Sequence, residues 1–270
     1  MMPDSRHHAG AVAHPRARLD AELSEAVASL ARHIAALPET SMRISGLVQQ
    51  VQSIRLERAT ELLDGIIRGT LDKHADCAAA YAALLVPEPM QHALGAGRCG
   101  MMLRWAEQRR LVAVRTWLLA PNVAGADRAE DAHRLIAQEL QHLTLGERRS
   151  RARRAGPAEL DRFLVDPDPG VIANLLNNPR ITESMVLRIC SRRPTVSDAL
   201  EAVFAAPRWG SRHAVRRALV RNPYFNQTYA LTLLPTLTRH ELAELSTDET
   251  LDETRRYAAA TLRALPPSGL

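Results

Sequence analysis

Apolar residues recur three and four positions apart along most of this chain, the spacing that places side chains on one face of an α-helix. The spacing is clearest between residues 160 and 263, in the pairs Val171 and Leu175, Met185 and Ile189, and Val215 and Leu219. Alternation of apolar and polar residues, the mark of a half-buried strand, extends over only a few positions. The pattern predicts an all-α protein.

Prolines divide the second half of the chain into short helical segments. They stand 12 to 16 residues apart, at Pro167, Pro179, Pro194, Pro207, Pro223 and Pro235. Because proline lacks a backbone donor and clashes with the preceding turn, only two or three helical turns fit between them. Helix starts are also recognisable: we expect Thr182 to be an N-cap, and Thr238 with Glu241 to form a capping box.

A segment of about forty residues occurs twice and begins a third time near Arg255. Residues 171–179 (Val-Ile-Ala-Asn-Leu-Leu-Asn-Asn-Pro) align with residues 215–223 (Val-Arg-Arg-Ala-Leu-Val-Arg-Asn-Pro) at an offset of 44. A short helix cannot bury its own apolar face, so neighbouring repeats must stack on one another, and a period of about 40 to 47 residues is typical of HEAT-like repeats. The sequence therefore predicts an α-solenoid.

Upstream of the repeats the same periodicity predicts further helices, with Pro38 and Pro87-Glu-Pro89 as breaks. The expected helical ranges are 19–37, 42–71 (one long helix, or two broken near Leu56), 75–86, 101–109, 111–119 and 128–143, with a loop at 121–127. The domain prediction is a disordered lead-in (1–18), an N-terminal helical region continuous with the repeats (19–143), the repeat region (144–265) and a flexible tail (266–270).

The run Leu-Thr-Leu-Gly-Glu-Arg-Arg-Ser-Arg-Ala-Arg at 143–153, followed by Leu-Val-Asp-Pro-Asp-Pro at 164–169 and Asn-Pro at 178–179, resembles a family of bacterial HEAT-like and leucine-rich-variant repeat proteins from high-GC proteobacteria. The resemblance covers roughly residues 144–262. It implies a solenoid fold, and it implies no chemistry, because the shared motifs are caps, turns and core positions.

Positive charge is concentrated in the repeats. From Arg148 onward 19 arginines face 13 acidic residues, whereas residues 1–147 carry 16 basic and 17 acidic ones, and Lys73 is the only lysine. Codon bias in a GC-rich genome and a binding surface both explain such a surplus. The candidate contact residues for a partner or for phosphate are the run Arg148, Arg149, Arg151, Arg153 and Arg154, and the two i, i+4 pairs Arg212, Arg216, Arg217 and Arg221.

A protein partner is favoured over nucleic acid for these arginines. One repeat earlier the positions of the second group hold Asp168, Ile172, Ala173 and Asn177, so the basic ridge does not continue along the solenoid. Aromatic residues, which would stack on bases, make up only 4% of the chain. A nucleic-acid-binding repeat protein is the alternative.

Three patterns suggest small-molecule or metal sites, and their surroundings argue against each of them. Gly95, Gly97 and Gly100 have the spacing of a dinucleotide-binding loop, but no strand precedes them and no acidic residue follows at the required distance. The Glu-x-x-His pairs at 130–133 and 139–142 project from opposite sides of one expected helix, so they cannot share a metal. The pair His74 and Cys77 lacks a second pair of ligands. No cofactor is expected.

Three tryptophans, Trp105, Trp117 and Trp209, raise the remote alternative of a HEAT-like DNA glycosylase, but no catalytic motif accompanies them. We expect Trp209 to cover a junction between repeats. The three cysteines, Cys77, Cys99 and Cys190, are far apart and indicate reduced thiols in the cytoplasm. Neither a signal peptide nor a membrane span is evident. The sequence predicts a non-enzymatic scaffold that binds another protein.

Overall fold

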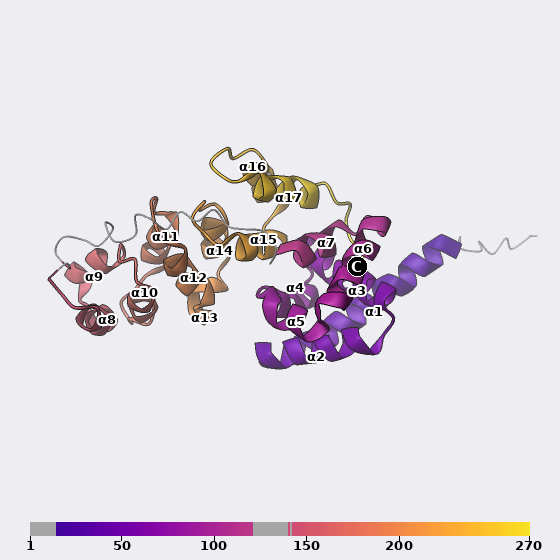
Figure 1. Cartoon of the computed structure of the whole chain (residues 1–270), viewed down its shortest axis with the longest axis horizontal. Helices are drawn as coiled ribbons and strands as arrows, with labels where there is room; N and C mark the ends of the chain where they lie inside the picture. The colour runs from indigo at the N-terminus through magenta and orange to yellow at the C-terminus, as the bar shows by residue number, and fades with distance from the viewer. Residues whose placement is uncertain (1–14, 121–139, 141) are drawn as a thin grey trace, which may run out of the picture.

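The computed structural model describes residues 15–120, 140 and 142–270, and within these ranges every regular element is a helix. The helices pack largely against their neighbours in the sequence, so the fold is all-α and solenoid-like, as predicted. Figure 1 shows three parts: an N-terminal bundle, a row of short helices that projects from it, and a C-terminal pair lying across their junction.

Residues 15–119 form the bundle. Its elements are α1 (Pro15–Ala35), α2 (Thr40–Ser53), α3 (Leu56–Leu71), α4 (Ala75–Tyr81), the 3₁₀ turn η1 (Ala82–Leu84), α5 (Pro87–Leu94), α6 (Ala96–Arg109) and α7 (Val112–Leu119). The central helix is α3, which contacts α1, α2, α4, α6 and α7. Gly65 permits the close approach of α1, since a Cβ at that position would lie 2.4 Å from a methyl group of Val27.

The breaks in the bundle agree with the prediction in one place and differ in another. Of the two alternatives for residues 42–71, the structure has two helices, α2 and α3, separated just before Leu56. Pro87 follows the preceding helical segment as expected, but it also occupies the first turn of α5, a helix that the sequence pattern did not predict; a proline there costs no hydrogen bond. The predicted loop at 121–127 and most of the predicted helix at 128–143 lie outside the described residues.

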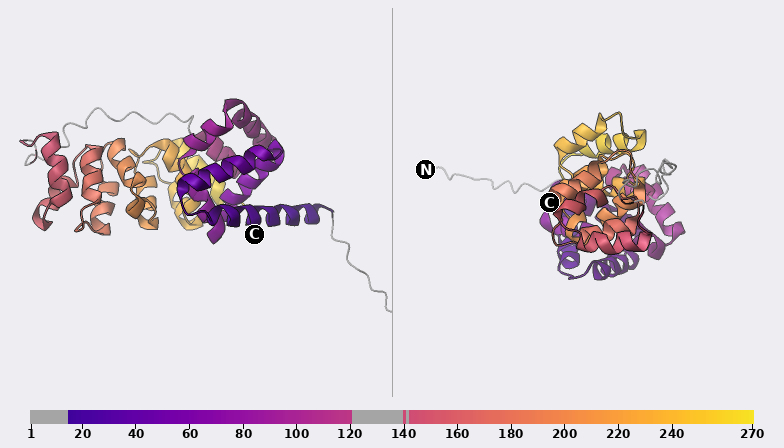
Figure 2. Two further views of the ribbon diagram at one scale, coloured as in Figure 1. Left: turned by 90° about the horizontal axis from the view of Figure 1, so that it is seen from below. Right: turned by 90° about the vertical axis from the view of Figure 1, so that its left-hand side faces the viewer.

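The row of helices contains α8 (Leu145–Arg154), α9 (Pro157–Phe163), α10 (Pro169–Leu176), α11 (Glu183–Ser191), α12 (Ser197–Ala205), α13 (Pro207–Gly210), α14 (His213–Val220), α15 (Gln227–Leu233) and the 3₁₀ turn η5 (Leu234–Thr236). The left view of Figure 2 shows the longer helices of this row standing side by side. Pro207 opens α13 and Pro235 lies in η5, as expected of helix breakers. The side chain of Thr182 caps α11, which confirms that N-cap.

The two copies of the repeat use the same buried asparagine. The side-chain amide of Asn178 donates to the carbonyls of Ala152 and Ala155, at 3.0 and 3.1 Å. The amide of Asn222 donates to the carbonyls of Cys190 and Arg192, at 2.8 and 3.0 Å. Each asparagine therefore ties its helix pair to helix ends earlier in the row, and this shared contact gives a physical role to the asparagine of the Asn-Pro that both copies contain.

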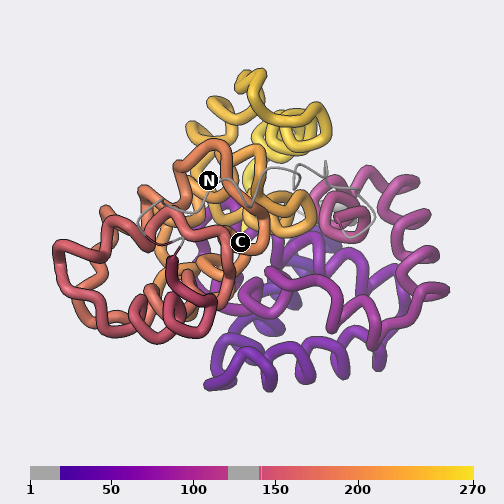
Figure 3. The backbone as a smooth tube through the Cα atoms, turned by 60° about the vertical axis from the view of Figure 1, so that its left-hand side comes forward, coloured from indigo at the N-terminus to yellow at the C-terminus, as the bar shows by residue number. Residues whose placement is uncertain are grey.

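The junction between row and bundle is formed by α15. The hydroxyl of Tyr81 donates to the carbonyl of Thr232 at 2.7 Å, and the hydroxyl of Thr232 donates to the carbonyl of Leu85 at 2.7 Å. The hydroxyl of Thr228 donates to the carbonyl of Ala120 at 3.0 Å. Figure 3, seen from another side, shows the orange end of the row, the part nearest to α15, meeting the bundle. The two regions thus meet through buried polar contacts.

The C-terminal helices are α16 (Arg239–Ser246) and α17 (Glu253–Arg263), which pack on each other, and α17 also contacts α7 and α15. The segment expected to be a flexible tail lies against α3. Arg68 donates to the carbonyls of Pro266 and Pro267, both at 3.1 Å, and the Ser268 N–H donates to Asp72. In the described part of the chain no helix has the length and apolarity needed to cross a membrane.

Candidate partner-binding groove

The arginines expected to form one ridge on α14 point in different directions, because successive residues of a helix are about 100° apart. Arg217 and Arg221 face α16. Arg216 turns toward α13 and donates through Nε to the carbonyl of Gly210 at 2.9 Å. Arg212 precedes the helix, lies 4.6 Å from the ring centre of Trp209 and forms an ion pair with Glu183. Only Arg217 and Arg221 therefore share a surface.

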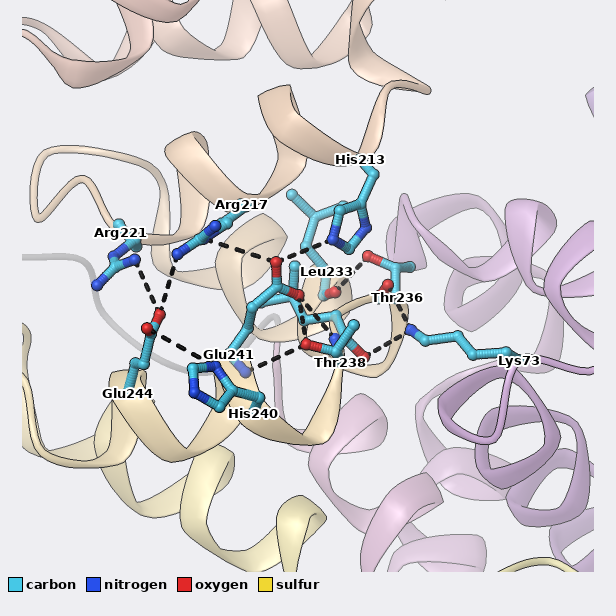
Figure 4. A network of polar contacts seen from close by, with 11 residues as sticks. Lys73, His213, Arg217, Arg221, Leu233, Thr236, Thr238, His240, Glu241 and Glu244 are labelled. Atoms are coloured by element: carbon cyan, nitrogen blue, oxygen red, sulfur yellow. Dashed lines mark hydrogen bonds and ion pairs between the residues drawn. The ribbon is translucent and has the colours of Figure 1, made fainter.

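Two glutamates of α16 hold these two arginines in place (Figure 4). Glu244 accepts from Arg217 at 3.1 Å and from Arg221 at 3.0 Å. Glu241 lies 3.6 Å from Arg217 and 2.9 Å from Nε2 of His213. The two side chains remain partly accessible, with exposures of 42% for Arg217 and 36% for Arg221. The network thus orients the arginines without burying them.

Glu241 also takes part in the N-terminal cap of α16. Its carboxylate accepts from the N–H and from the hydroxyl of Thr238, at 2.8 and 2.9 Å, which confirms the predicted capping box. Burial would raise the pKa of Glu241, but the hydrogen bonds from Thr238 and His213 outweigh it and lower this pKa overall. The glutamate is thus a stable anion that links the cap of α16 to α14.

The loop before α16 is fastened to the bundle by Lys73. Its ammonium group donates to the carbonyls of Thr236 and Leu237, at 2.8 and 2.6 Å, as Figure 4 shows for Thr236. Lys73 has a φ of 67°, so it sits in the left-handed region that follows α3. The bundle, α16 and α14 are therefore connected through one chain of polar contacts.

A groove of about 460 Å³ lies between α11 and α14, beside this network. Its apolar lining consists of Leu187, Cys190, Ala214 and Ala218, and its polar lining of Ser191, Arg193, His213, Arg217 and Arg221. Burial raises the pKa of the Cys190 thiol to about 12, so this sulfur is an uncharged part of the floor. Since no acidic side chain belongs to the lining, the groove joins an apolar floor to a cationic rim.

The other basic run lies on α8 and divides into two groups. Arg148 forms an ion pair of 2.8 Å with the buried Asp166, and Arg149 binds both carboxylate oxygens of Asp168, at 3.0 and 3.1 Å. The remaining arginines of the run, Arg151, Arg153 and Arg154, are exposed and form no ion pair with any described residue. Arg148 and Arg149 therefore hold α8 to the residues before α10. The other three arginines are exposed to solvent.

The glycine-rich and His/Cys motifs that the sequence analysis considered as binding sites have structural roles or lack the required neighbours. Gly95 stands between α5 and α6 with a φ of 78°, which a glycine adopts freely, and a helix precedes it where a dinucleotide loop needs a strand. His74 precedes α4 and Cys77 is buried within it. Among the described residues no group of three or more His, Cys, Asp or Glu side chains could hold a metal ion. Three members of the Glu-x-x-His pairs, Glu130, His133 and Glu139, lie outside the residues that the structure describes.

The tryptophans do not line a common cleft. The indole N–H of Trp117 donates to the carbonyl of Leu84 at 2.8 Å, and that of Trp209 donates to the carbonyl of Leu176 at 3.0 Å. Both side chains are buried. Trp209 therefore covers the contact between α13 and α10, as predicted.

Sequence reasoning identified Arg217 and Arg221 but missed Glu244, the residue that pairs with both. Glu244 lies on α16, and the two helices belong to different copies of the pattern, so sequence spacing carries no signal of their contact. The sequence predicted the capping role of Glu241 but not its contacts with His213 and Arg217. Comparison of the chain with protein-family models, curated proteins and solved structures gives no match in any of the three.

Proposed function

We propose that this protein is a non-enzymatic helical-repeat scaffold, of the HEAT-like kind that its period suggests, and that it binds a partner protein in the groove between α11 and α14. The observation that carries the proposal is the groove itself, with its apolar floor and its rim of Arg193, Arg217 and Arg221. A segment with one or two apolar side chains flanked by carboxylates matches this surface. With its three free cysteines, the protein is expected to work in the reducing cytoplasm.

The ion pairs favour a protein over nucleic acid. A phosphate backbone is bound by an extended run of positive charge, and the basic side chains of this site are confined to a short rim in which Arg217 and Arg221 are already ion-paired with Glu241 and Glu244. Exposed aromatic rings that could stack on bases are few in the described part of the chain, where Tyr257 is the one large aromatic side chain with high exposure. An apolar floor with a polar rim is typical of protein interfaces.

Selection of peptides from a random phage-displayed library on the immobilised full chain tests the proposal. We expect enriched peptides to combine Asp or Glu with Leu, Ile or Phe, and we expect synthetic versions of them to bind with a measurable Kd by fluorescence anisotropy. In Arg217→Ala/Arg221→Ala the affinity should fall by about tenfold or more, because charge-assisted hydrogen bonds at the rim are lost.

The matched control is Arg151→Ala/Arg153→Ala, which removes the same charge from α8 and should leave peptide affinity unchanged. Partly exposed ion pairs contribute little to stability, so both variants should fold, as circular dichroism would verify. Enrichment of basic or purely polar peptides, or equal binding to both variants, would contradict the proposal.

A nucleic-acid-binding role is the alternative, and one observation favours it. Arg151, Arg153 and Arg154 project from the last turn of α8, the helix at the far end of the row in Figure 1. If nucleic acid binds, the α8 variant should lose affinity and the α14 variant should keep it, so the same pair of variants separates the two roles.

A further inference from the structure

A second cavity of about 460 Å³ lies where the bundle meets the row of helices. The bundle contributes Thr40, Leu85 and Val86, and the row contributes residues of α12, α13, α14 and α15. On the row side the rings of Phe204 and Tyr229 are stacked, with centroids 4.9 Å apart and planes 22° from parallel. Such a size, an apolar lining and a place between two regions are typical of sites for small molecules.

Arg216 lines this cavity and forms no ion pair with any described residue. Arg216 uses Nε for the carbonyl of Gly210, and its two terminal nitrogens have no hydrogen-bond or ion-pair partner among the described residues. The contrast with Arg217 and Arg221 on the same helix is direct, since each of those has a glutamate. Burial lowers the pKa of Arg216, so the protein bears a desolvation cost at this position that an anion would offset.

The acidic group of the lining limits the charge of a ligand. Glu201 also lines the cavity, and one of its oxygens accepts from Ser197 and from Asn226, both at 3.0 Å. Glu201 repels any anion in the cavity, and the repulsion is weaker for a monocarboxylate than for a phosphate dianion. The stacked rings offer a face to an aromatic or other flat apolar group.

We propose that this cavity binds a small monocarboxylate with an apolar, preferably aromatic, body, its carboxylate on Arg216 and its apolar part against Tyr229 and Phe204. Arg216 thereby has a role separate from the partner-binding groove, which lies on the Arg217 side of α14. The proposed carboxylate site does not depend on the proposed scaffold function, because the cavity and the groove have different lining residues.

The test uses 3-phenylpropionate as the probe, with the uncharged 3-phenylpropanol and the cation phenethylamine for comparison, by isothermal titration calorimetry on the full chain. We expect 3-phenylpropionate to bind with a Kd of about 1 mM or tighter, and the other two to bind at least about tenfold more weakly. Inorganic phosphate should not compete. Equal affinity for the three organic probes, no binding by the carboxylate, or displacement by phosphate would overturn the proposal.

Two variants locate the site. Arg216→Met keeps the apolar stem and removes the charge, so carboxylate affinity should fall about tenfold or more. Ala205→Phe places a ring at the rim of the cavity from an exposed position of α12, where no buried contact is lost, and it should block binding even if Arg216→Met folds poorly. Arg217→Met is the matched control and should bind like the wild type. Unchanged binding in Ala205→Phe would place the probe elsewhere and refute the assignment.

Discussion

The guanidinium group of Arg255 donates two hydrogen bonds to the side-chain oxygen of Gln227, at 3.0 and 2.7 Å, although Arg255 is only 1% exposed. It also donates to the carbonyls of Val220, Asn222 and Phe225. Arg255 begins the weak third copy of the repeat, where the earlier copies have a buried valine. The last repeat is therefore joined to the preceding one by a buried polar contact in place of an apolar one.

Arg255→Met should destabilise the protein by about 3 kcal/mol, because several buried carbonyls would lose their donor while the apolar stem is kept. Urea unfolding followed by circular dichroism measures the change. Arg263→Met, an exposed substitution on the same helix, should change the free energy of unfolding by less than about 0.5 kcal/mol. Equal stability of the two variants would show that the buried network does not hold the last repeat.

Asn222→Ala should cost about 2 kcal/mol, since the carbonyls of Cys190 and Arg192 would be buried without a partner. Asn178→Ala should cost a similar amount for the same reason. The control is Asn177→Ala, whose exposed amide bonds within its own helix. If Asn177→Ala is as harmful as Asn178→Ala in the same urea experiment, the repeat contact is not the cause.

Asp64→Asn should raise stability at neutral pH. Burial raises the pKa of Asp64 above its ordinary value of 3.8, although the N–H of Val114 and the charge of Arg68 partly oppose the shift. A carboxyl whose folded pKa is raised destabilises the folded state when ionised, and this cost disappears as pH falls and the group becomes neutral. Asparagine keeps the acceptor that binds Val114.

The urea midpoint of Asp64→Asn should therefore exceed that of the wild type at pH 7, and the two should converge toward pH 3. Asp20→Asn, an exposed substitution on α1, gives the control for a change of net charge alone. A gap that widens with falling pH would contradict this account of Asp64.

The thiols should react slowly with maleimide in the folded protein. Burial raises the pKa of Cys77 to about 11 and that of Cys190 to about 12, so almost no thiolate exists at pH 7.5. Cys99 is only half-buried and should be modified first. Mass spectrometry after timed labelling measures the order, and rapid modification of Cys190 without denaturant would mean that the floor of the groove opens.

Local patterns allowed much of the fold to be predicted. The apolar spacing, the prolines and the caps at Thr182 and Thr238 depend on residues close in sequence, and the structure confirms those caps. The helix α5 was missed, because a proline such as Pro87 that follows one helix can also open the next one.

The candidate site could be predicted only in part. That Arg216 and Arg217 face different regions follows from helix geometry once the packing partners of α14 are known. Those partners are α11 on one side and η5 on another, and a repeat pattern does not reveal them. Ion pairs such as Arg221 with Glu244 join separate helices and leave no trace in local spacing.

The central claim is that the groove beside α14 binds protein and that the chain is not a nucleic-acid-binding module. The most direct measurement is fluorescence anisotropy of a library-selected acidic peptide and of a mixed-sequence duplex DNA, each at about 50 and 200 mM salt, the range in which phosphate-driven affinity collapses. We expect the peptide to bind at both salt concentrations, to lose affinity in Arg217→Ala/Arg221→Ala, and to be unaffected by excess DNA. Tight DNA binding that falls steeply with salt would contradict the claim, whether or not the DNA displaces the peptide.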